Sequence, residues 1–270
     1  MSDFPITGPI WFVGCGNMGG AILRRWLEAG LDPAQVTVIR KSGEPFADGV
    51  TVLAVPPADG AIPAMVVLGV KPQMIDQIAP SLAPTLGSET TLVSILAGVE
   101  LAALRQRFAA PGLIVRAMPN TPVAIGQGAT GLVADQADAA ARAPVSASFA
   151  LLGLTEWVDE PLMDAVSALS GSGPAFLFRF VDALAHAGAD MGLPADQAAR
   201  LALATVAGAG ALAASSAETP HQLAERVASP GGSTRRGLDV LDEPEGLKPL
   251  VRNTLTAALL RNREMAAAAR

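Results

Sequence analysis

Up to about residue 160, the chain alternates short apolar runs with stretches of helical period. Six apolar runs recur at intervals, at residues 9–14, 36–40, 64–70, 91–98, 113–118 and 128–134. Several are unbroken, which is typical of strands that are covered on both faces. Amphipathic stretches such as 21–30 and 99–108 lie between them. Strands that alternate with helices predict an α/β domain with a parallel, doubly wound sheet over residues 1–160.

The pattern changes after Glu160 and becomes alanine-rich with a helical period throughout. Three long segments share this character, at residues 161–193, 194–216 and 247–269. Proline stands near several expected helix starts, where its missing N–H is tolerated. We therefore predict a second, all-helical domain over residues 161–270. Its helices carry more apolar surface than a small domain can hide, so we expect it to form a homodimer.

Composition narrows the classes of partner. The net charge of −6 and the lack of a basic stripe argue against nucleic acid. The most apolar long stretch, residues 175–193, carries Arg179 and Asp182, so we expect no membrane span. The first residues lack the pattern of a secretion signal, which predicts a cytoplasmic protein. The single cysteine, Cys15, cannot form a disulfide within the chain.

A glycine-rich turn follows the first apolar run. Residues 12–22 read FVGCGNMGGAI, with glycine at 14, 16 and 19 between the run and a helical stretch. In a strand-turn-helix context, Gly14 permits a tight turn, Gly16 lets a pyrophosphate approach, and Gly19 lets the helix pack closely. Unpaired N–H groups at the helix start favour the same anion. The motif predicts a Rossmann-type site for a dinucleotide. Cys15 fits as a small residue of this turn, although a reactive thiol is the alternative.

The end of the second apolar run indicates which dinucleotide. An NAD site usually has an acidic residue there, which binds the ribose hydroxyls. This chain instead has Arg40, Lys41 and Ser42. Their charge suits a 2′-phosphate, so we predict NADPH as the preferred cofactor, with NADH possible. Whether Arg40 or Lys41 faces the phosphate stays open.

Later apolar runs end in segments suited to the rim of the same crevice, since ligands bind beyond the carboxyl ends of the strands. These are Val70-Lys71-Pro72, Ala97-Gly98 and Met118-Pro119-Asn120. For any one of them alone, an ordinary strand-ending turn explains the sequence equally well.

Two further glycine clusters lie in the helical part. Residues 170–174 read SGSGP, before a long apolar helix. Residues 229–234 read SPGGST and lead into a helix expected to begin near Thr234. Hydroxyl groups and consecutive backbone N–H groups of this kind can hold a small carboxylate. A serine cap explains Ser233 or Thr234 but not the two glycines.

Together these motifs resemble the pyrroline-5-carboxylate reductases. FVGCGNMGGAI, GVKPQ, SILAGV, RAMPNTP, SALSGSGPAF and VASPGGST occur in that family's order and spacing, over about residues 9–265. The resemblance implies NAD(P)H-dependent reduction of 1-pyrroline-5-carboxylate to L-proline, the last step of proline synthesis. It also implies a Rossmann domain, a helical dimerisation domain and an assembly of dimers, often a ring. Two features depart from the family: Ser233 stands where threonine is frequent, and residues 52–64 lack an asparagine that many members carry near the adenosine.

The resemblance and the charge argument together give two sets of site residues. Carried over by position, the cofactor set is Gly14, Cys15, Gly16, Asn17, Met18, Gly19, Val70, Lys71, Pro72, Ala97, Gly98 and Asn120, and the charge at the end of the second apolar run adds Arg40 and Lys41. The substrate set is Ser172, Ser229, Gly231, Gly232, Ser233 and Thr234. Thr234 is the expected catalytic residue, through a hydrogen bond from its hydroxyl to the ring nitrogen.

The expected chemistry needs no metal, because a protonated imine is already a good electrophile. The chain has only two histidines, His186 and His221, and no paired metal-ligand spacing. β-Hydroxyacid dehydrogenases are the nearest rival class and commonly use an interdomain lysine as their acid or base. No lysine lies between Lys71 and Lys248, which disfavours them. A non-catalytic nucleotide sensor is the second alternative, but it would not need the SPGGST segment.

Overall fold

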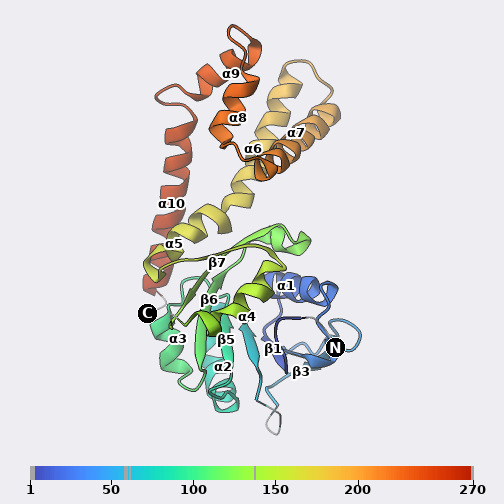
Figure 1. Ribbon diagram of the computed structural model, residues 1–270, viewed down its shortest axis with the longest axis vertical. Helices are drawn as coiled ribbons and strands as arrows, with labels where there is room; N and C mark the ends of the chain where they lie inside the picture. The colour runs from blue at the N-terminus through green and yellow to red at the C-terminus, as the bar shows by residue number, and fades with distance from the viewer. Residues whose placement is uncertain (1–3, 58–59, 61, 137, 269–270) are drawn as a thin grey trace. The chain divides into compact units, whose positions relative to one another are not determined.

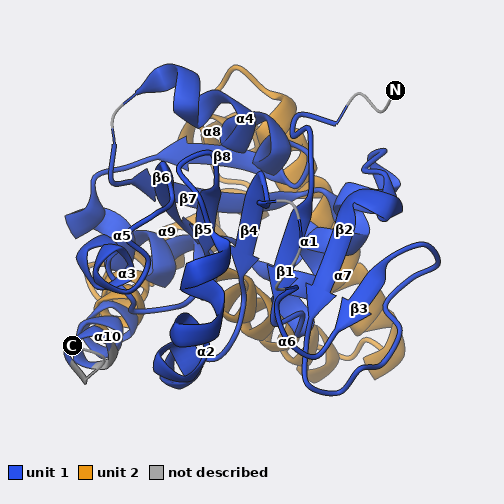
Figure 2. Ribbon diagram, turned by 90° about the horizontal axis from the view of Figure 1, so that it is seen from below, with its two compact units in different colours: residues 1–172, 258–270 blue, residues 173–257 orange. Residues whose placement is uncertain are grey.

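The computed structural model describes residues 4–57, 60, 62–136 and 138–268 (Figure 1). The chain divides into two compact units, residues 1–172 with 258–270, and residues 173–257 (Figure 2). Residues 161–172 and the described part of the chain after 257 therefore pack with the sheet, although they continue the helical sequence pattern. The assignment of residues 1–160 to the cofactor and 161–270 to dimerisation and substrate stays a prediction about function.

The first unit is built on one eight-stranded sheet in the order β3-β2-β1-β4-β5-β6-β7-β8. The strands are β1 (Ile10–Val13), β2 (Val36–Ile39), β3 (Thr51–Leu53), β4 (Met65–Leu68), β5 (Thr91–Ser94), β6 (Leu113–Met118), β7 (Gly128–Ala134) and β8 (Gly153–Trp157). All neighbouring pairs are parallel except β6 and β7. The predicted α/β fold with a following helical part is confirmed.

Three details of the sheet differ from the sequence prediction. Strands β3 and β8 were not anticipated, because β3 is short and β8 alternates between half-buried and exposed positions. The pair β6–β7 is antiparallel, whereas alternating strands and helices predicted a parallel sheet throughout. Only residues 119–127 join these strands, and a parallel crossover needs a dozen residues or more.

Helices cover both faces of the sheet, as the unbroken apolar runs predict. Helices α1 (Asn17–Glu28) and α4 (Ala139–Ala150) pack on one face. Helices α2 (Ile75–Leu82), α3 (Leu101–Arg107) and the short α5 (Met163–Val166) pack on the other. Strand β1 serves both layers, because successive side chains of a strand point to opposite faces. Ile10 and Phe12 belong to the first core, and Trp11 and Val13 belong to the second.

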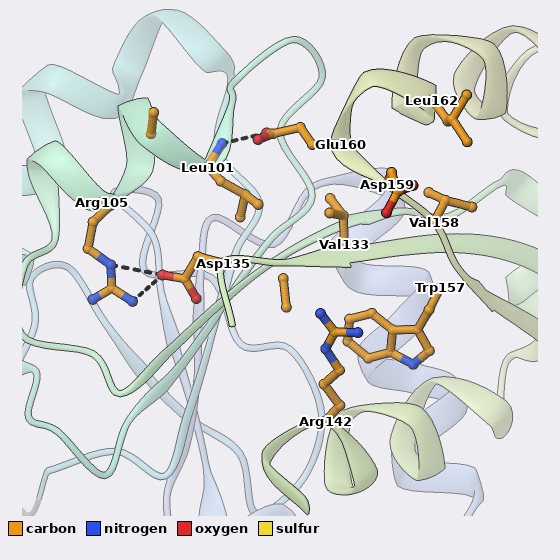
Figure 3. A pocket seen from close by; sticks show the side chains of 12 residues that line it. Leu101, Arg105, Val133, Asp135, Arg142, Trp157, Val158, Asp159, Glu160 and Leu162 are labelled. Carbon is orange, nitrogen blue, oxygen red and sulfur yellow. Dashed lines mark hydrogen bonds and ion pairs between the residues drawn. The ribbon is translucent and has the colours of Figure 1, made fainter. Parts of the chain in front are cut away.

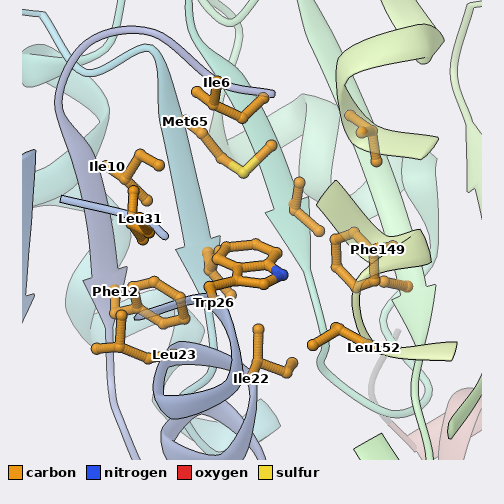
Figure 4. Close-up of a cluster of buried hydrophobic side chains, with 14 of the residues drawn as sticks. Ile6, Ile10, Phe12, Ile22, Leu23, Trp26, Leu31, Met65, Phe149 and Leu152 are labelled. Atoms are coloured by element: carbon orange, nitrogen blue, oxygen red, sulfur yellow. The ribbon is translucent and has the colours of Figure 1, made fainter. Parts of the chain in front are cut away.

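Trp26 of α1 is the centre of the first core (Figure 4). Its side chain is fully buried, and its ring makes edge-on contacts with Phe4, Phe12 and Phe149. The indole Nε1 donates to the carbonyl of Ser148 at 2.8 Å, so the polar end of the ring is also satisfied. The helix that follows the glycine turn is therefore fixed firmly onto the sheet.

The second unit is entirely helical in its described residues. It contains α6 (Gly173–Asp190), α7 (Ala195–Ser215), α8 (Pro220–Val227), α9 (Ser233–Leu241) and the first half of α10 (Leu247–Ala268). Many of its large apolar side chains are exposed in the single chain, among them Leu177, Phe178, Phe180, Leu201, Leu203, Leu212 and Leu250. Helix α7 is long and apolar enough to cross a membrane, and it alone is so among the described residues. Length and composition are weak support for such a role.

Candidate functional site

The glycine turn between β1 and α1 has the geometry of an anion site. Gly14 has a φ of +78°, and a β-carbon there would lie 2.6 Å from Val70 Cγ1 and 2.9 Å from its backbone nitrogen. Only glycine fits this position. Gly16 is the N-cap of α1, and nothing lies within 4 Å of the place where its β-carbon would be. The turn is therefore closely packed against Val70 at Gly14 and open to a ligand at Gly16.

The first amide groups of α1 are left for a ligand. No side chain caps the helix, and its first turn contains no acidic residue. Orphan N–H groups and the positive end of the helix dipole favour a phosphate group here. Gly19 lies one turn along, where a β-carbon would approach Gly14 O at 3.3 Å. The residues present thus fit the pyrophosphate of a dinucleotide.

A pocket of about 320 Å³ adjoins this turn. It brings together Gly14, Arg40, Lys41 and Val70, four members of the predicted cofactor set. Sequence reasoning missed the rest of its wall, which consists of Val13, Ile39, Ala54, Val55, Pro56, Met74, Gln77, Ile78 and Ser81. The helical spacing of Met74, Gln77, Ile78 and Ser81 was the available signal, because residues three and four apart share a helix face.

Arg40 is held in place by the loop that follows it. Its Nε donates to Glu44 O at 3.0 Å, and its Nη2 donates to Glu44 O and, at 2.8 Å, to Pro45 O. Its backbone N donates to Leu53 O at 2.8 Å, which joins the end of β2 to β3. Lys41 beside it is exposed. Both cations thus line the pocket, Arg40 in a fixed pose and Lys41 without a side-chain partner among the described residues.

The other predicted cofactor residues follow β4, β5 and β6 at the same edge of the sheet. Lys71 is the N-cap of the short helix η2 (Pro72–Met74), and Gly98 has a φ of +76°. Asn120 uses its side chain within the protein, where Nδ2 donates to Ser170 O at 3.1 Å and Oδ1 accepts from Ala129 N at 2.9 Å. The carboxamide of Asn120 therefore serves the fold, and its place in the cofactor set stays a prediction.

Ser170 belongs to a π-helical turn, η6 (Ser167–Gly171), that ends at the predicted substrate residue Ser172. The backbone N of Ser172 donates to Ser167 O at 2.9 Å, and Ser170 Oγ donates to Val166 O at 2.9 Å. Short π-helical turns occur frequently at functional sites. Asn120 thus links the end of β6 to this turn.

The SPGGST segment joins α8 to α9 within the second unit. Gly231 has a φ of +71°, and the backbone N of Gly232 donates to Ser229 O at 2.9 Å. Helix α9 begins at Ser233 with Gly232 as its N-cap, no side chain caps it, and its first turn contains no acidic residue. The serine-cap explanation is thereby excluded, and the amide groups of Ser233 and Thr234 remain available to an anion.

Ionic contacts surround this segment. Arg235 donates through Nη1 to both carboxylate oxygens of Glu225, each at 2.9 Å. These bonds raise the pKa of the Arg235 guanidinium above its usual value, and the charges of Glu225, Asp239 and Asp242 add to the effect. Arg226 pairs with Glu218 across α8.

A second pocket, of about 730 Å³, holds none of the predicted site residues (Figure 3). Its polar groups serve the fold: Arg105 pairs with Asp135, and Glu160 accepts from Leu101 N at 2.7 Å. Glu160 also accepts from the buried Arg116 of β6 at 2.7 Å. This pair joins β6 to the chain just before α5. A charged residue inside the run LIVRAM was the sequence signal for it.

The open glycine start of α1 and the cationic pocket beside it define a Rossmann-type dinucleotide site, of the class found in nicotinamide-dependent oxidoreductases. Residues 160–265 match the family described as pyrroline-5-carboxylate reductase dimerisation, and residues 9–98 match the family described as NADP oxidoreductase, coenzyme F420-dependent.

Full-length relatives agree. Pyrroline-5-carboxylate reductase of Pseudomonas aeruginosa is 37% identical over 96% of this chain and 97% of its own length. That of Pisum sativum is 36% identical over 94% of both. The solved structure of the Coxiella burnetii reductase has a TM-score of 0.87 at 34% identity, and covers 96% of this chain and 98% of its own. The Plasmodium falciparum structure, with NADP bound, has a TM-score of 0.83 at 26% identity, with the same coverage. The chain belongs to the pyrroline-5-carboxylate reductase family.

Cys15, inside the glycine turn, should be an unreactive thiol. Burial raises its pKa to about 11, although the charges of Arg40 and Arg24 counteract part of the shift. An ordinary thiol has a pKa of about 8.5, so Cys15 should have far less thiolate at pH 8. We expect negligible iodoacetamide labelling of the native protein at pH 8, and faster labelling as the pH approaches 11. Since Cys15 is the only cysteine, mass spectrometry of the intact chain measures this directly. Labelling at pH 8 as fast as in the urea-unfolded protein would contradict it.

Proposed function

We propose that this chain reduces 1-pyrroline-5-carboxylate to L-proline with a nicotinamide cofactor, the reaction named by its full-length relatives. The observation that carries the proposal is the uncapped glycine start of α9, because it offers a carboxylate site made of backbone amides. The first unit supplies the dinucleotide site, which a nucleotide sensor would also have. The start of α9 offers a second anion site, for a substrate carboxylate, which a nucleotide sensor would not need.

NADPH is the preferred cofactor in this proposal. Arg40 and Lys41 line the pocket beyond β2, where an NAD site would carry an acidic residue. The NADP-bound relative from Plasmodium falciparum is consistent with this choice. When bound, the reduced nicotinamide supplies the hydride. The glycine turn holds the pyrophosphate, and the backbone beyond β4, β5 and β6 forms the rim.

The substrate is held by its carboxylate and oriented by one hydroxyl. The amides of Ser233 and Thr234 bind the carboxylate, with Ser229, Gly231 and Gly232 shaping the turn. The hydroxyl of Thr234 forms a hydrogen bond with the ring nitrogen, and Ser172 lines the substrate. The imine carbon receives the hydride and the nitrogen carries the proton, so the protein needs no strong acid. Orientation of this kind contributes roughly 7–11 kcal/mol in favourable cases.

The active form is a homodimer or a ring of dimers. The apolar side chains exposed on α6, α7 and α10 lie within the residues that match the dimerisation family. Burial against a second copy also accounts for α7, whose apolar length would otherwise suit a membrane. The protein is therefore proposed to be cytoplasmic. Among the described residues, no group of three or more acidic, histidine and cysteine side chains could hold a metal ion.

The reaction itself is tested by turnover. Purified protein mixed with NADPH and pyrroline-5-carboxylate should oxidise the cofactor, followed by absorbance at the reduced nicotinamide band, with L-proline as product. Protein with NADPH alone is the control. If titration shows that NADPH binds but no proline forms, the proposed reaction is wrong. Reduction of NADP⁺ by a β-hydroxyacid, measured in a separate assay, would favour the rival enzyme class.

Charge reversal at Arg40 tests the cofactor preference. Arg40→Glu should weaken NADPH by about tenfold or more, because a charge-assisted contact to phosphate is lost. NADH binding should change by less than about threefold, since it has no 2′-phosphate. Dissociation constants from fluorescence titration measure both. Lys41→Glu is the matched variant beside it, and a selective loss there alone would transfer the phosphate contact to Lys41. If Arg40→Glu weakened NADPH and NADH binding equally, Arg40 would not contact the 2′-phosphate.

Removal of the Thr234 hydroxyl tests its catalytic assignment. Thr234→Ala should lower kcat/KM for pyrroline-5-carboxylate by roughly 5- to 30-fold, the usual effect of one lost hydrogen bond to a charged group. Thr234→Ser keeps the hydroxyl and should retain most activity. Affinity for NADPH should stay the same in both variants. Loss of NADPH binding would mean that the SPGGST segment serves the cofactor instead.

A further inference from the structure

The geometry of the SPGGST turn depends on few packing contacts. No atom lies within 4 Å of the place where a β-carbon of Gly231 would be, and Ser229 and Pro230 are exposed. Within the turn, the bond from Gly232 N to Ser229 O is the backbone link. Two glycines also give the segment wide conformational freedom. The positions of the Ser233 and Thr234 amides must therefore be fixed largely by the helices on either side.

The side chain of Arg235 joins those helices. It directly follows Thr234 in the first turn of α9, and each of its guanidinium nitrogens faces a different acid. Nη1 bonds both oxygens of Glu225 near the end of α8 at 2.9 Å. Nε lies 3.2 Å from Asp239 Oδ1, one turn along α9. Nη2 lies 3.5 Å from Asp242 Oδ2, at the C-cap of α9. One planar group thus spans the end of α8 and the length of α9.

Exposure separates Arg235 from the ordinary ion pairs of this surface. The side chain of Arg235 is 26% exposed, whereas that of Arg236 next to it is 82% exposed. The ion pair of Arg236, from Nη1 to Asp239 Oδ2, is long, at 3.9 Å. A single exposed ion pair contributes little to the stability of the folded structure, whereas a fixed network of several charges contributes more. Lysine cannot reproduce the network, since a point charge lacks the planar fork of arginine.

We propose that Arg235 is a positioning residue for substrate: its guanidinium ties α8 to α9 and thereby sets the geometry of the amides that hold the substrate carboxylate. This role rests on the proposed function of the SPGGST turn. Arg235 does not itself touch the carboxylate in this account. Its Nη1 is hydrogen-bonded to Glu225, while the buried Nε, which makes no hydrogen bond, and Nη2 lie at ion-pair distance from Asp239 and Asp242. Its charge also offsets the three carboxylates around it, which would otherwise repel an anionic substrate.

Variants of the full-length protein separate the geometric role from charge alone. Arg235→Gln and Arg235→Lys are compared with Arg236→Gln, which removes the same charge one residue away. Both Arg235 variants should raise the KM for pyrroline-5-carboxylate about tenfold, with kcat within about threefold of the parent. The inhibition constant of L-proline should rise in parallel. Arg236→Gln should change KM by less than about twofold. NADPH affinity should be unchanged in all three variants.

A second readout does not depend on turnover. Amide hydrogen exchange in peptides covering residues 228–236 should be faster in both Arg235 variants and unchanged in Arg236→Gln. Glu225→Gln should change amide exchange and KM as much as Arg235→Gln does. The double variant should show no larger change than either single variant, because each substitution removes the same contact between α8 and α9.

Several results would overturn the proposal. Parent-like KM in Arg235→Lys would mean that charge suffices, and an equal KM increase in Arg236→Gln would mean a general field effect. If amide exchange in residues 228–236 were the same in the Arg235 variants as in the parent, Arg235 would not order the turn, whatever the kinetic results. If the parent protein lacks turnover, the proposed function fails, and the exchange comparison still decides whether Arg235 orders the turn.

Discussion

The account depends on backbone amide groups left unpaired at two helix starts. Helices α1 and α9 both begin at a glycine N-cap in extended conformation, Gly16 with φ −77° and Gly232 with φ −77°. Neither has a side-chain cap or an acidic residue in its first turn. The chain does cap other helices: α8 has a complete capping box from Thr219 and Gln222, and Asp138 caps α4. Amides left open at a glycine start attract anions, so these two starts are suited to the phosphates of a cofactor and the carboxylate of a substrate.

The rest of the structure supports those two starts in different ways. The first is fixed by a deep core, in which Trp26 holds α1 onto the sheet and Gly14 fits closely against Val70. The second has little core beneath it and is joined instead by the acids around Arg235. Such a difference suits their ligands, since a dinucleotide needs a long rigid surface and a small ring needs only a few well-placed groups. The apolar side chains that the helices expose in the single chain lie within the residues that match the dimerisation family, as expected for an interface between copies of the chain.

Much of the fold could be predicted because burial leaves a clear pattern in sequence. All six apolar runs became strands, and the glycine motif lies between β1 and α1 as expected. Strands β3 and β8 lie at the two edges of the sheet and are partly exposed. The three-residue β3 is too short to stand out, and β8 alternates between half-buried and exposed positions. The antiparallel pair β6–β7 depends on the length of a connection rather than on its hydrophobicity. The division at residue 172 follows from packing of 161–172 and the end of α10 with the sheet, which helical periodicity does not reveal.

The candidate site was predictable where backbone conformation sets the residue type. Gly14 and Gly231 both have positive φ, so their glycines carry a signal. Pocket walls such as Met74 and Ile78 have ordinary helical residues, and only the folded chain brings them to Arg40. The Arg235–Glu225 contact joins residues ten apart through a turn whose path the sequence does not specify. Asn120 was assigned to the cofactor, yet its carboxamide holds the π-helical turn, a use that depends on tertiary structure.

A crystal structure with NADP⁺ and L-proline bound together tests the central claim most directly. The account predicts pyrophosphate oxygens about 3 Å from the first amides of α1, and the proline carboxylate about 3 Å from the amides of Ser233 and Thr234. The nicotinamide C4 should lie about 3.5 Å from a proline ring carbon. A proline carboxylate bound by side-chain cations elsewhere, with the start of α9 facing only solvent in every subunit, would contradict it.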